Sequence, residues 1–215
     1  MLTELQQKAI AVKQAQTEYP IHELLRTRWS PRALDARPVE TEKLQSVLEA
    51  ARWSASGGNM QPWSFLIARK AVEPALFERM VSCLSEGNVP WASQAPVLGI
   101  AVASLYRRPE VLNRHAFHDV GMALQNLALQ ARALDLYTHF MGGFSPDKAR
   151  ELFAIPPEHE AATMFALGYL GDPDSLPEKN REGELTARTR RPLRDFIFGE
   201  QWGVTSPLLP TQNNE

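Results

Sequence analysis

Apolar residues recur at helical spacing in several stretches of this chain. Side chains three or four positions apart share one face of a helix, so each stretch predicts a helix with one buried side. The helices expected in this way lie within residues 3–18 and 21–27, from Thr41 to before Gly57, from Pro74 to about Leu84, from about His115 to Leu134, and from Ser145 onward. We expect Thr41 and Ser145 to be N-caps, and Pro74 and Pro146 to be first helical residues.

The helix from about His115 to Leu134 is the longest, and we expect it at the centre of the fold. Its predicted buried face consists of Phe117, Val120, Leu124, Leu127, Ala128 and Ala131. Short apolar runs predict strands at residues 63–68, 96–103, 136–140 and 162–170. From Gly171 to Arg191 the chain is polar and poor in large apolar groups, so we expect a surface loop there.

The end of the chain, residues 193–210, is apolar but too short to form a core of its own. It carries Phe196, Ile197, Phe198 and Trp202. Exposed apolar patches of this kind mark interaction surfaces. We therefore expect a partner subunit to cover this segment.

Size and composition fit a single globular domain: 215 residues, 44% of them hydrophobic. The formal charge of −2 argues against a nucleic-acid-binding surface. Cys83, the single cysteine, excludes a disulfide framework and favours a reducing compartment. No signal pattern opens the chain, and no run approaches the roughly 20 apolar residues that cross a bilayer. We expect a cytoplasmic protein with neither membrane nor nucleic-acid partners.

Two arginine-rich clusters stand far apart in the sequence: Arg28-Trp29-Ser30-Pro31-Arg32 and Arg188-Thr189-Arg190-Arg191-Pro192. Either cluster alone is most simply a solvated surface. Together, guanidinium groups and a serine hydroxyl suit a phosphate, because the planar fork makes charge-assisted bidentate hydrogen bonds. Between the clusters, residues 54–63 offer side-chain amides and backbone N–H groups that fit the polar edge of a heterocycle. A phosphate and a heterocycle predict a nucleotide cofactor.

Other kinds of site fit the sequence less well. His115 and His118 share a helix face, but no further ligand stands at convincing spacing, so we predict no metal site. Gly57-Gly58 lacks the lysine and hydroxyl of a phosphate-binding P-loop, and Gly142-Gly143 lacks the spacing of a dinucleotide fingerprint. No nucleophile elbow is present either.

Taken together, four segments of the chain resemble the FMN-dependent nitroreductase family. They are residues 28–32, residues 54–63 with Asn59-x-Gln61-Pro62-Trp63, residues 141–144, and residues 188–193, in an order and spacing that covers about residues 20–199. The resemblance implies an α+β fold in which a mixed β-sheet lies between two helical layers, within an intertwined homodimer. It also implies one FMN-binding domain over residues 1–192 and a C-terminal arm, residues 193–215, that packs on the partner subunit.

The resemblance also implies roles for individual residues. It gives a phosphate clamp made of Arg28, Ser30, Arg188 and Arg190. Trp29 would contribute through its backbone. Arg32 would lie nearer the N1 and O2 edge of the flavin, where a cation stabilises the negative charge that reduction places on the ring. Asn88 would bond to the pyrimidine edge.

A second group of residues would act across the dimer interface. Ala55, Ser56 and Gly57 resemble the stretch that reaches the partner's flavin. Asn59 and Gln61 would shape that stretch or bind the flavin directly.

The turn Met141-Gly142-Gly143-Phe144 is the expected reaction centre. One of its backbone N–H groups would face flavin N5, the atom that accepts and donates hydride, and glycine allows so close an approach. Some relatives carry an acidic residue at the position of Gly142; the backbone contact does not depend on it.

The function that the resemblance implies is an FMN-dependent oxidoreductase. NADH or NADPH would donate hydride, and a nitroaromatic, a quinone or a similar flat acceptor would receive it in a ping-pong reaction through flavin N5. No side-chain acid or base is expected to be catalytic, because the flavin performs the chemistry. Two alternatives stay open: a specialised flavin dehydrogenase or flavin-modifying enzyme on the same scaffold, and a flavin-binding sensor or storage protein without turnover.

Overall fold

The computed structural model describes residues 2–210. Its helices are α1 (Glu4–Val12), α2 (Glu23–Thr27), α3 (Thr41–Arg52), α4 (Pro74–Val81), α5 (Val89–Ala92), α6 (Ala116–Ala133), α7 (Pro146–Phe153) and α8 (Glu178–Leu185). Its strands are β1 (Trp63–Arg69), β2 (Val97–Ser104), β3 (Tyr106–Arg108), β4 (Val111–Leu112), β5 (Tyr137–Met141) and β6 (His159–Gly168). Short 3-10 turns lie at Gly57–Asn59, Pro173–Ser175 and Leu193–Asp195. Each helix and strand expected from the sequence is present.

The main sheet has the strand order β1-β2-β6-β5. Within the described part of the chain each of its pairings is antiparallel, with Trp63 opposite Ala103, Val97 opposite Leu167, and Tyr137 opposite Gly168 in register. The sheet of this one chain is therefore antiparallel where the resemblance implied a mixed sheet. Strands β3 and β4 form a separate small hairpin.

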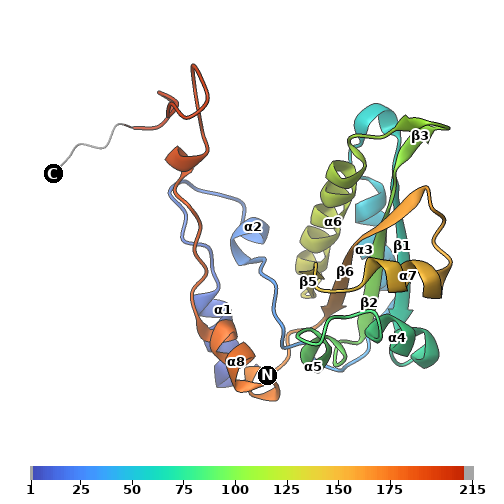
Figure 1. The fold of residues 1–215 in the computed structure, drawn as a ribbon. Coiled ribbons are helices and arrows are strands. Elements are labelled where there is room, and N and C mark those ends of the chain that lie inside the picture. The colour runs from blue at the N-terminus through green and yellow to red at the C-terminus, as the bar shows by residue number, and fades with distance from the viewer. Residues whose placement is uncertain (1, 211–215) are drawn as a thin grey trace.

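Helices cover both faces of the sheet (Figure 1). Helices α3 and α6 pack on one face, while α4 and α7 pack on the other. Because successive strand residues point to opposite faces, β2 contributes to both cores: Ile100 lies in the core beneath α4, and Ala101 in the core beneath α6. The expected three-layer α+β architecture is confirmed.

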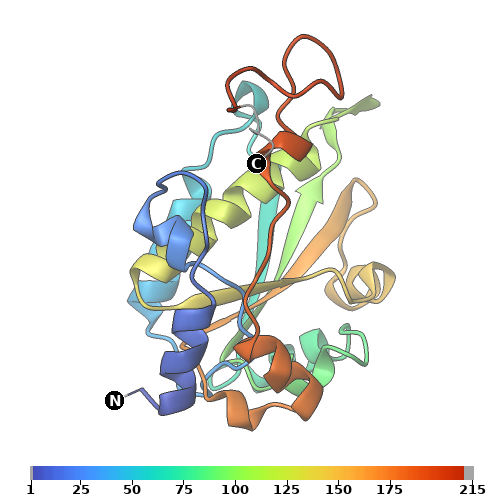
Figure 2. The ribbon, with the colours of Figure 1, turned by 90° about the vertical axis from the view of Figure 1, so that its left-hand side faces the viewer.

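Helices α1 and α8, from the N-terminal and C-terminal parts of the chain, lie side by side, apart from α4 and α7 (Figure 1). Helix α1 contacts α8, and the chain beyond α8 runs along the same side of the molecule (Figure 2). A buried hydrogen bond from Gln6 Nε2 to the carbonyl oxygen of Leu170, 2.9 Å long, ties α1 to the residues after β6. These N-terminal and C-terminal segments, residues 3–32 and 171–210, are called the terminal segments below.

Three details of the sequence prediction are wrong. Thr41 is the first residue of α3, and Glu40 takes the N-cap position without a side-chain bond. Phe117 is 49% exposed, because it lies outside the face of α6 that meets the sheet. The segment 171–191 is not a plain loop: it contains α8, whose Glu184 is only 2% exposed. Helix α5 and the hairpin β3–β4 were not expected.

The predicted buried face of α6 is otherwise confirmed, since Val120, Leu124, Leu127, Ala128 and Ala131 are buried. Ser145 caps α7 as expected, because its Oγ accepts the N–H of Lys148 at 3.1 Å. Among residues 2–210, no helix is long and apolar enough to cross a membrane.

Candidate functional site

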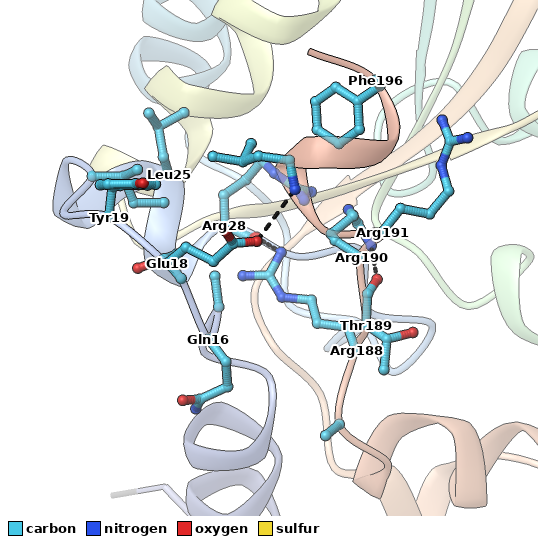
Figure 3. A pocket seen from close by; sticks show the side chains of 15 residues that line it. Gln16, Glu18, Tyr19, Leu25, Arg28, Arg188, Thr189, Arg190, Arg191 and Phe196 are labelled. Carbon is cyan, nitrogen blue, oxygen red and sulfur yellow. Dashed lines mark hydrogen bonds between the residues drawn. The ribbon is translucent and has the colours of Figure 1, made fainter. Parts of the chain in front are cut away.

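The two arginine clusters meet in the folded chain. They surround a cavity of about 170 Å³ that is lined by Lys13, Arg28, Trp29, Ser30, Arg188 and Arg190. Each residue of the predicted phosphate clamp is therefore present at one cavity, although 160 residues separate Arg28 from Arg188. Figure 3 shows the side chains of Arg28, Arg188 and Arg190 gathered between the two terminal segments. Lys13 was not predicted; it is the C-cap of α1, and no motif marks it.

Arg188 holds the two terminal segments together. Its Nε donates to the carbonyl oxygen of Lys13 at 2.6 Å, its Nη1 to that of Arg28 at 2.7 Å, and its Nη2 to that of Arg26 at 2.7 Å. A guanidinium group has five N–H donors, so two of them remain for a ligand. Arg188 thus lines the cavity and also fixes the backbone around it through three carbonyl groups.

The arginines of this cavity form no ion pair with a carboxylate of the described chain. Within residues 2–210, no carboxylate lies within 4.0 Å of the guanidinium groups of Arg28, Arg188 or Arg190. Burial lowers the pKa of Arg28, and the neighbouring Arg190 lowers it further. Burial likewise lowers the pKa of Arg188, with repulsion from Arg28 and Arg190. An anion in the cavity would relieve that repulsion, and a phosphate group fits the donor set.

Arg28 is aligned with the serine of its own motif. Its Nη1 lies 3.4 Å from Ser30 Oγ, which places a hydroxyl beside a guanidinium at the same cavity. The ring of Trp29 is buried and meets Tyr137 edge-on, with 6.0 Å between centroids. The indole is therefore part of the core, and its backbone belongs to the cavity-lining segment.

Arg32 is fixed by a separate set of contacts and does not line this cavity. Its N–H donates to Glu184 Oε1 at 3.0 Å, and its guanidinium lies 6.0 Å from the centroid of Trp91. Trp91 in turn packs against His139 with the two rings tilted and 4.4 Å between their centroids. Burial lowers the pKa of His139 to about 4, so the ring is neutral at pH 7 and its Nδ1–H donates to the carbonyl oxygen of Pro31 at 3.1 Å.

The turn at Gly142 and Gly143 lies against the loop that carries Asn88. The carbonyl oxygen of Gly143 accepts Asn88 Nδ2 at 2.9 Å and the N–H of Ser85 at 3.0 Å. A Cβ on Gly143 would come within 2.7 Å of Asn88 Nδ2 and of Ser85 Oγ, whereas a Cβ on Gly142 would meet no protein atom within 4 Å. Packing on this loop accounts for Gly143, and the space at Gly142 is open.

Met141 precedes this turn at the end of β5 and is buried. Its carbonyl oxygen accepts Thr163 Oγ1 from β6 at 2.9 Å. The sheet thereby positions the start of the glycine turn. Of the residues predicted for the flavin's ring edge, the structure brings Asn88, Met141, Gly142 and Gly143 together.

The segment with Ala55, Ser56 and Gly57 is held in an unusual conformation. Gln61 donates its backbone N–H to Ser56 Oγ at 3.0 Å and its Nε2 to Asn59 Oδ1 at 3.1 Å. Asn59 and Gln61 have positive φ angles of 56° and 47°, a region that non-glycine residues seldom adopt. Such strain concentrates at binding and catalytic segments.

Asp119 anchors this segment, and sequence reasoning missed it. Its Oδ2 accepts the N–H of Gly57 at 3.0 Å, and its Oδ1 lies 2.9 Å from His118 Nδ1. Burial opposes ionisation of Asp119, but the hydrogen bonds from His118 and Gly57 outweigh it and lower the pKa of the carboxyl group. The pattern His115-Ala116-Phe117-His118-Asp119 is the available signal; it indicates helix packing and surface hydrogen bonds rather than a metal site, but it does not point to Gly57 as a partner.

One chain does not bring residues 55–61 to the arginine cavity. Gly57 bonds to Asp119 in the first turn of α6, whereas Trp29 packs on Tyr137, which follows the end of that helix. The 18 residues of α6 span about 27 Å at 1.5 Å per residue. The two halves of the predicted site thus lie at opposite ends of the central helix.

The histidines at the start of α6 do not gather metal ligands. The rings of His115 and His118 are 6.2 Å apart between centroids. In the part of the chain that the structure describes, no group of three or more His, Cys, Asp or Glu residues is placed to hold a metal ion.

Comparison with known proteins identifies the family. The model of the nitroreductase family matches residues 25–90 and 81–169, which together make up more than half of the chain. The chain belongs to the nitroreductase family. The matched residues of this nitroreductase family member include Arg28 to Arg32, Ser54 to Trp63 and Met141 to Phe144, while the cluster at Arg188 lies beyond them.

Solved structures agree with this assignment. A crystal structure described as an oxidoreductase containing FMN is 34% identical, with a TM-score of 0.83 over 88% of this chain and 96% of that one. A nitroreductase family protein from Clostridium difficile is 26% identical, with a TM-score of 0.67 over 85% of this chain and 99% of that one. A protein of Archaeoglobus fulgidus named "Putative NADH dehydrogenase/NAD(P)H nitroreductase" is 26% identical over 69% of this chain and 84% of its own length. The resemblance and the α+β fold expected from the sequence are confirmed.

Proposed function

We propose that this nitroreductase family member is an FMN-dependent NAD(P)H oxidoreductase, which passes reducing equivalents to nitroaromatics, quinones or similar flat acceptors in a ping-pong reaction. The observation that carries the proposal is the cavity in which Arg28, Ser30, Arg188 and Arg190 converge without a protein counter-ion. The relatives named for FMN and for NAD(P)H support the same cofactors. When bound, FMN supplies the hydride-accepting N5 atom.

The residues of the cavity would hold the phosphate. Arg28 and Arg190 offer guanidinium donors, Ser30 offers a hydroxyl, and Arg188 has two N–H groups left after its three bonds to carbonyls. Trp29 would contribute through its backbone. Arg32 lies outside this cavity. On the family resemblance we assign it to the N1 and O2 edge of the ring, where a cation would favour reduction of the flavin.

The glycine turn would lie at the reactive edge of the ring. Gly142 leaves open space, so the backbone can approach a ligand closely there. Asn88 keeps one N–H and its Oδ1 for the pyrimidine edge after its bond to Gly143. No side chain is assigned as acid or base, because the chain's residues orient the cofactor and the donor rather than transfer the hydride.

We propose that the site is completed in a homodimer, with Ala55, Ser56, Gly57, Asn59 and Gln61 supplied by the partner subunit. The separation of these residues from the arginine cavity by the length of α6 supports this arrangement. Residues 55–61 of one subunit would then contact the flavin ring bound by the other subunit.

The domain of residues 1–192 and the arm of residues 193–215 stay part of this proposal; residues 211–215 of the arm lie outside the described residues. Trp202 is 91% exposed, and a groove of about 880 Å³ lies between residues 15–28 and 187–196. Its wall includes Tyr19, Leu25 and Phe196 (Figure 3). Cover by a second copy would bury these apolar groups. The cytoplasmic location also stays a prediction.

Anaerobic stopped-flow mixing tests the function. The purified protein should be yellow and should release FMN on denaturation. NADH or NADPH should then bleach the bound flavin rapidly, and a quinone or nitroaromatic should restore its colour. Bound flavin that neither donor bleaches would indicate a sensor or storage protein, and a single acceptor that outpaces all others would indicate a specialised dehydrogenase. A colourless protein that FMN cannot reconstitute would contradict the proposal.

A further inference from the structure

A fourth cation enters the arginine cavity from outside the two arginine clusters. Lys13, the C-cap of α1, lines the same 170 Å³ cavity as Arg28, Arg188 and Arg190. It precedes the first cluster in the sequence and lies outside the residues that the family model matches. Its presence there follows from the fold, because α1 packs against α8 beside the cavity.

Hydrogen bonds hold Lys13 in place at both its backbone and its side chain. Its Nζ donates to the carbonyl oxygen of Gly183 at 2.6 Å, and its own carbonyl oxygen accepts Arg188 Nε at 2.6 Å. The ammonium also lies 5.5 Å from the centroid of Trp29. An ammonium group has three N–H donors, so two remain for a ligand. The side chain is thus preorganised at the cavity, which lowers the entropy cost of binding.

Lys13 also has no close counter-ion. In the described part of the chain, no carboxylate lies within 4.0 Å of its Nζ. The charged groups that act on it are Glu184, Arg188 and Arg32. Burial lowers the pKa of Lys13, Glu184 opposes that change, and the two arginines add to it. Glu184 accepts the N–H of Arg32 at its Oε1, and its buried Oε2 makes no hydrogen bond among the described residues, so its charge acts on Lys13 without direct contact.

We propose that Lys13 is a phosphate-binding residue of this chain and donates to the FMN phosphate beside Arg28, Ser30 and Arg190. The proposal rests on the proposed function, since it names one more contact of the same site. It also gives α1 a role beyond packing: the helix delivers a cation that the motif residues do not supply. Arg188 uses three of its five N–H donors on backbone carbonyls. The two free N–H donors of Lys13 would add to the two that Arg188 has left for the phosphate.

A comparison of FMN with riboflavin isolates the phosphate contact. Lys13→Met removes the charge but keeps an apolar stem against Trp29, and Lys13→Arg keeps the charge. Lys8→Met is the matched control, because Lys8 is an exposed residue of the same helix. Dissociation constants of both flavins for each full-length apoprotein would be measured by fluorescence quenching, with inorganic phosphate as a competitor.

Lys13→Met should weaken FMN binding about tenfold to a hundredfold, the range for loss of a charged hydrogen bond, and should leave riboflavin binding unchanged. Lys13→Arg should restore much of the loss, Lys8→Met should have no effect, and inorganic phosphate should compete less well in the Met variant. Equal weakening of FMN and riboflavin, or FMN binding at the parental level, would overturn the assignment of Lys13. A parent that does not prefer FMN to riboflavin would overturn the proposed function itself.

Discussion

Apolar residues are buried to different degrees in two regions of the molecule. One region is the sheet with its covering helices, and the other consists of the two terminal segments. Leu127 of α6 and Phe165 of β6 are fully buried within the sheet region, residues 34–170. In the C-terminal segment, by contrast, Trp202 is 91% exposed and Leu208 is 80% exposed. The terminal segments are joined by the hydrogen bonds of Arg188 to backbone carbonyls of residues 13–28 and by a few small or aromatic core residues, such as Ala9 and Trp29, while their outer apolar residues stay uncovered.

Because of this difference, we expect the two regions to contribute differently to folding and to binding. The sheet region has its own apolar core, so substitutions there should act mainly on stability. The terminal segments carry the cationic cavity and an uncovered apolar surface, so substitutions there should act mainly on cofactor affinity and association.

Removal of the C-terminal arm should have the largest effect. A chain that ends at Pro192 loses Phe196 and Trp202, and we expect it to lose both the dimer and the flavin while the sheet region stays folded. Sedimentation, flavin absorbance and circular dichroism would be measured on the same sample. A truncated protein that is monomeric yet fully loaded with FMN would show that the arm and the second subunit are unnecessary.

Protonation of His139, in the sheet region, should have the second largest effect. Burial lowers the pKa of His139 from 6.5 to about 4, so the folded state favours the neutral ring. Stability from this group is complete above pH 6.5 and is lost as the pH falls toward 4. The loss is roughly 3 kcal/mol, because each pKa unit corresponds to about 1.4 kcal/mol.

His139→Phe keeps an aromatic ring beside Trp91 but cannot titrate. Urea denaturation of the apoproteins at several pH values should show the parent losing stability relative to this variant between pH 6.5 and 4. Parallel stability curves would mean that His139 is hydrated in the folded protein and that its region is not the closed core described above.

A substitution at the glycine turn should slow the chemistry and leave binding nearly intact. Gly142→Val places a branched side chain in space that no protein atom occupies within 4 Å. Displacement of the reacting groups by about 1 Å can reduce a rate on the order of a hundredfold. Single-turnover reduction of bound flavin by NAD(P)H, at saturating FMN, measures this step.

Gly143→Val is the comparison variant, because its side chain would collide with Asn88 and Ser85 and so disturb packing as well. If Gly142→Val holds FMN and is reduced at the parental rate, the turn is only the end of a strand and the reaction centre lies elsewhere.

Loss of one clamp residue should have the smallest effect of the series. Arg28→Ala should weaken FMN binding by about 1.5–3 kcal/mol, the range for a hydrogen bond to a charged group. Arg107→Ala, in the exposed hairpin, is the matched control and should bind FMN like the parent. Urea denaturation of the apoprotein should give similar stabilities for both variants. A large loss of apoprotein stability in Arg28→Ala alone would contradict the expectation that substitutions in the terminal segments act mainly on binding.

The parts of the fold that depend on local spacing were predictable. Ser145 and Pro146 mark the start of α7, and the buried face of α6 follows its apolar spacing except at Phe117. Helix α8 was missed because its buried side chain is Glu184, a carboxylate whose partner is a backbone N–H 152 residues away. Apolar periodicity contains no information about such a contact.

The same reason limits the prediction of the site. Arg28, Ser30, Arg188 and Arg190 stand in recognisable motifs, and the structure does bring them together at one cavity. Lys13 stands in no motif, and its partner Gly183 is 170 residues away. Likewise, no sequence pattern indicates that Arg188 would use three donors on carbonyl groups, since those bonds exist only after the terminal segments have met.

In the proposed dimer, each FMN site combines the arginine cavity of one subunit with residues 55–61 of the other. A heterodimer tests it directly. One chain would carry Arg28→Ala with Arg190→Ala, and the other would carry Ala55→Trp at a position that is exposed in the single chain. Each homodimer should bind little FMN.

In the heterodimer, purified through two different tags, one site combines both defects and the other combines both intact halves. We expect one FMN bound per heterodimer, with parental affinity at that site, as measured by flavin absorbance and equilibrium dialysis. A heterodimer that binds no more FMN than the two homodimers would mean that both halves come from the same chain, and it would contradict a site shared between subunits.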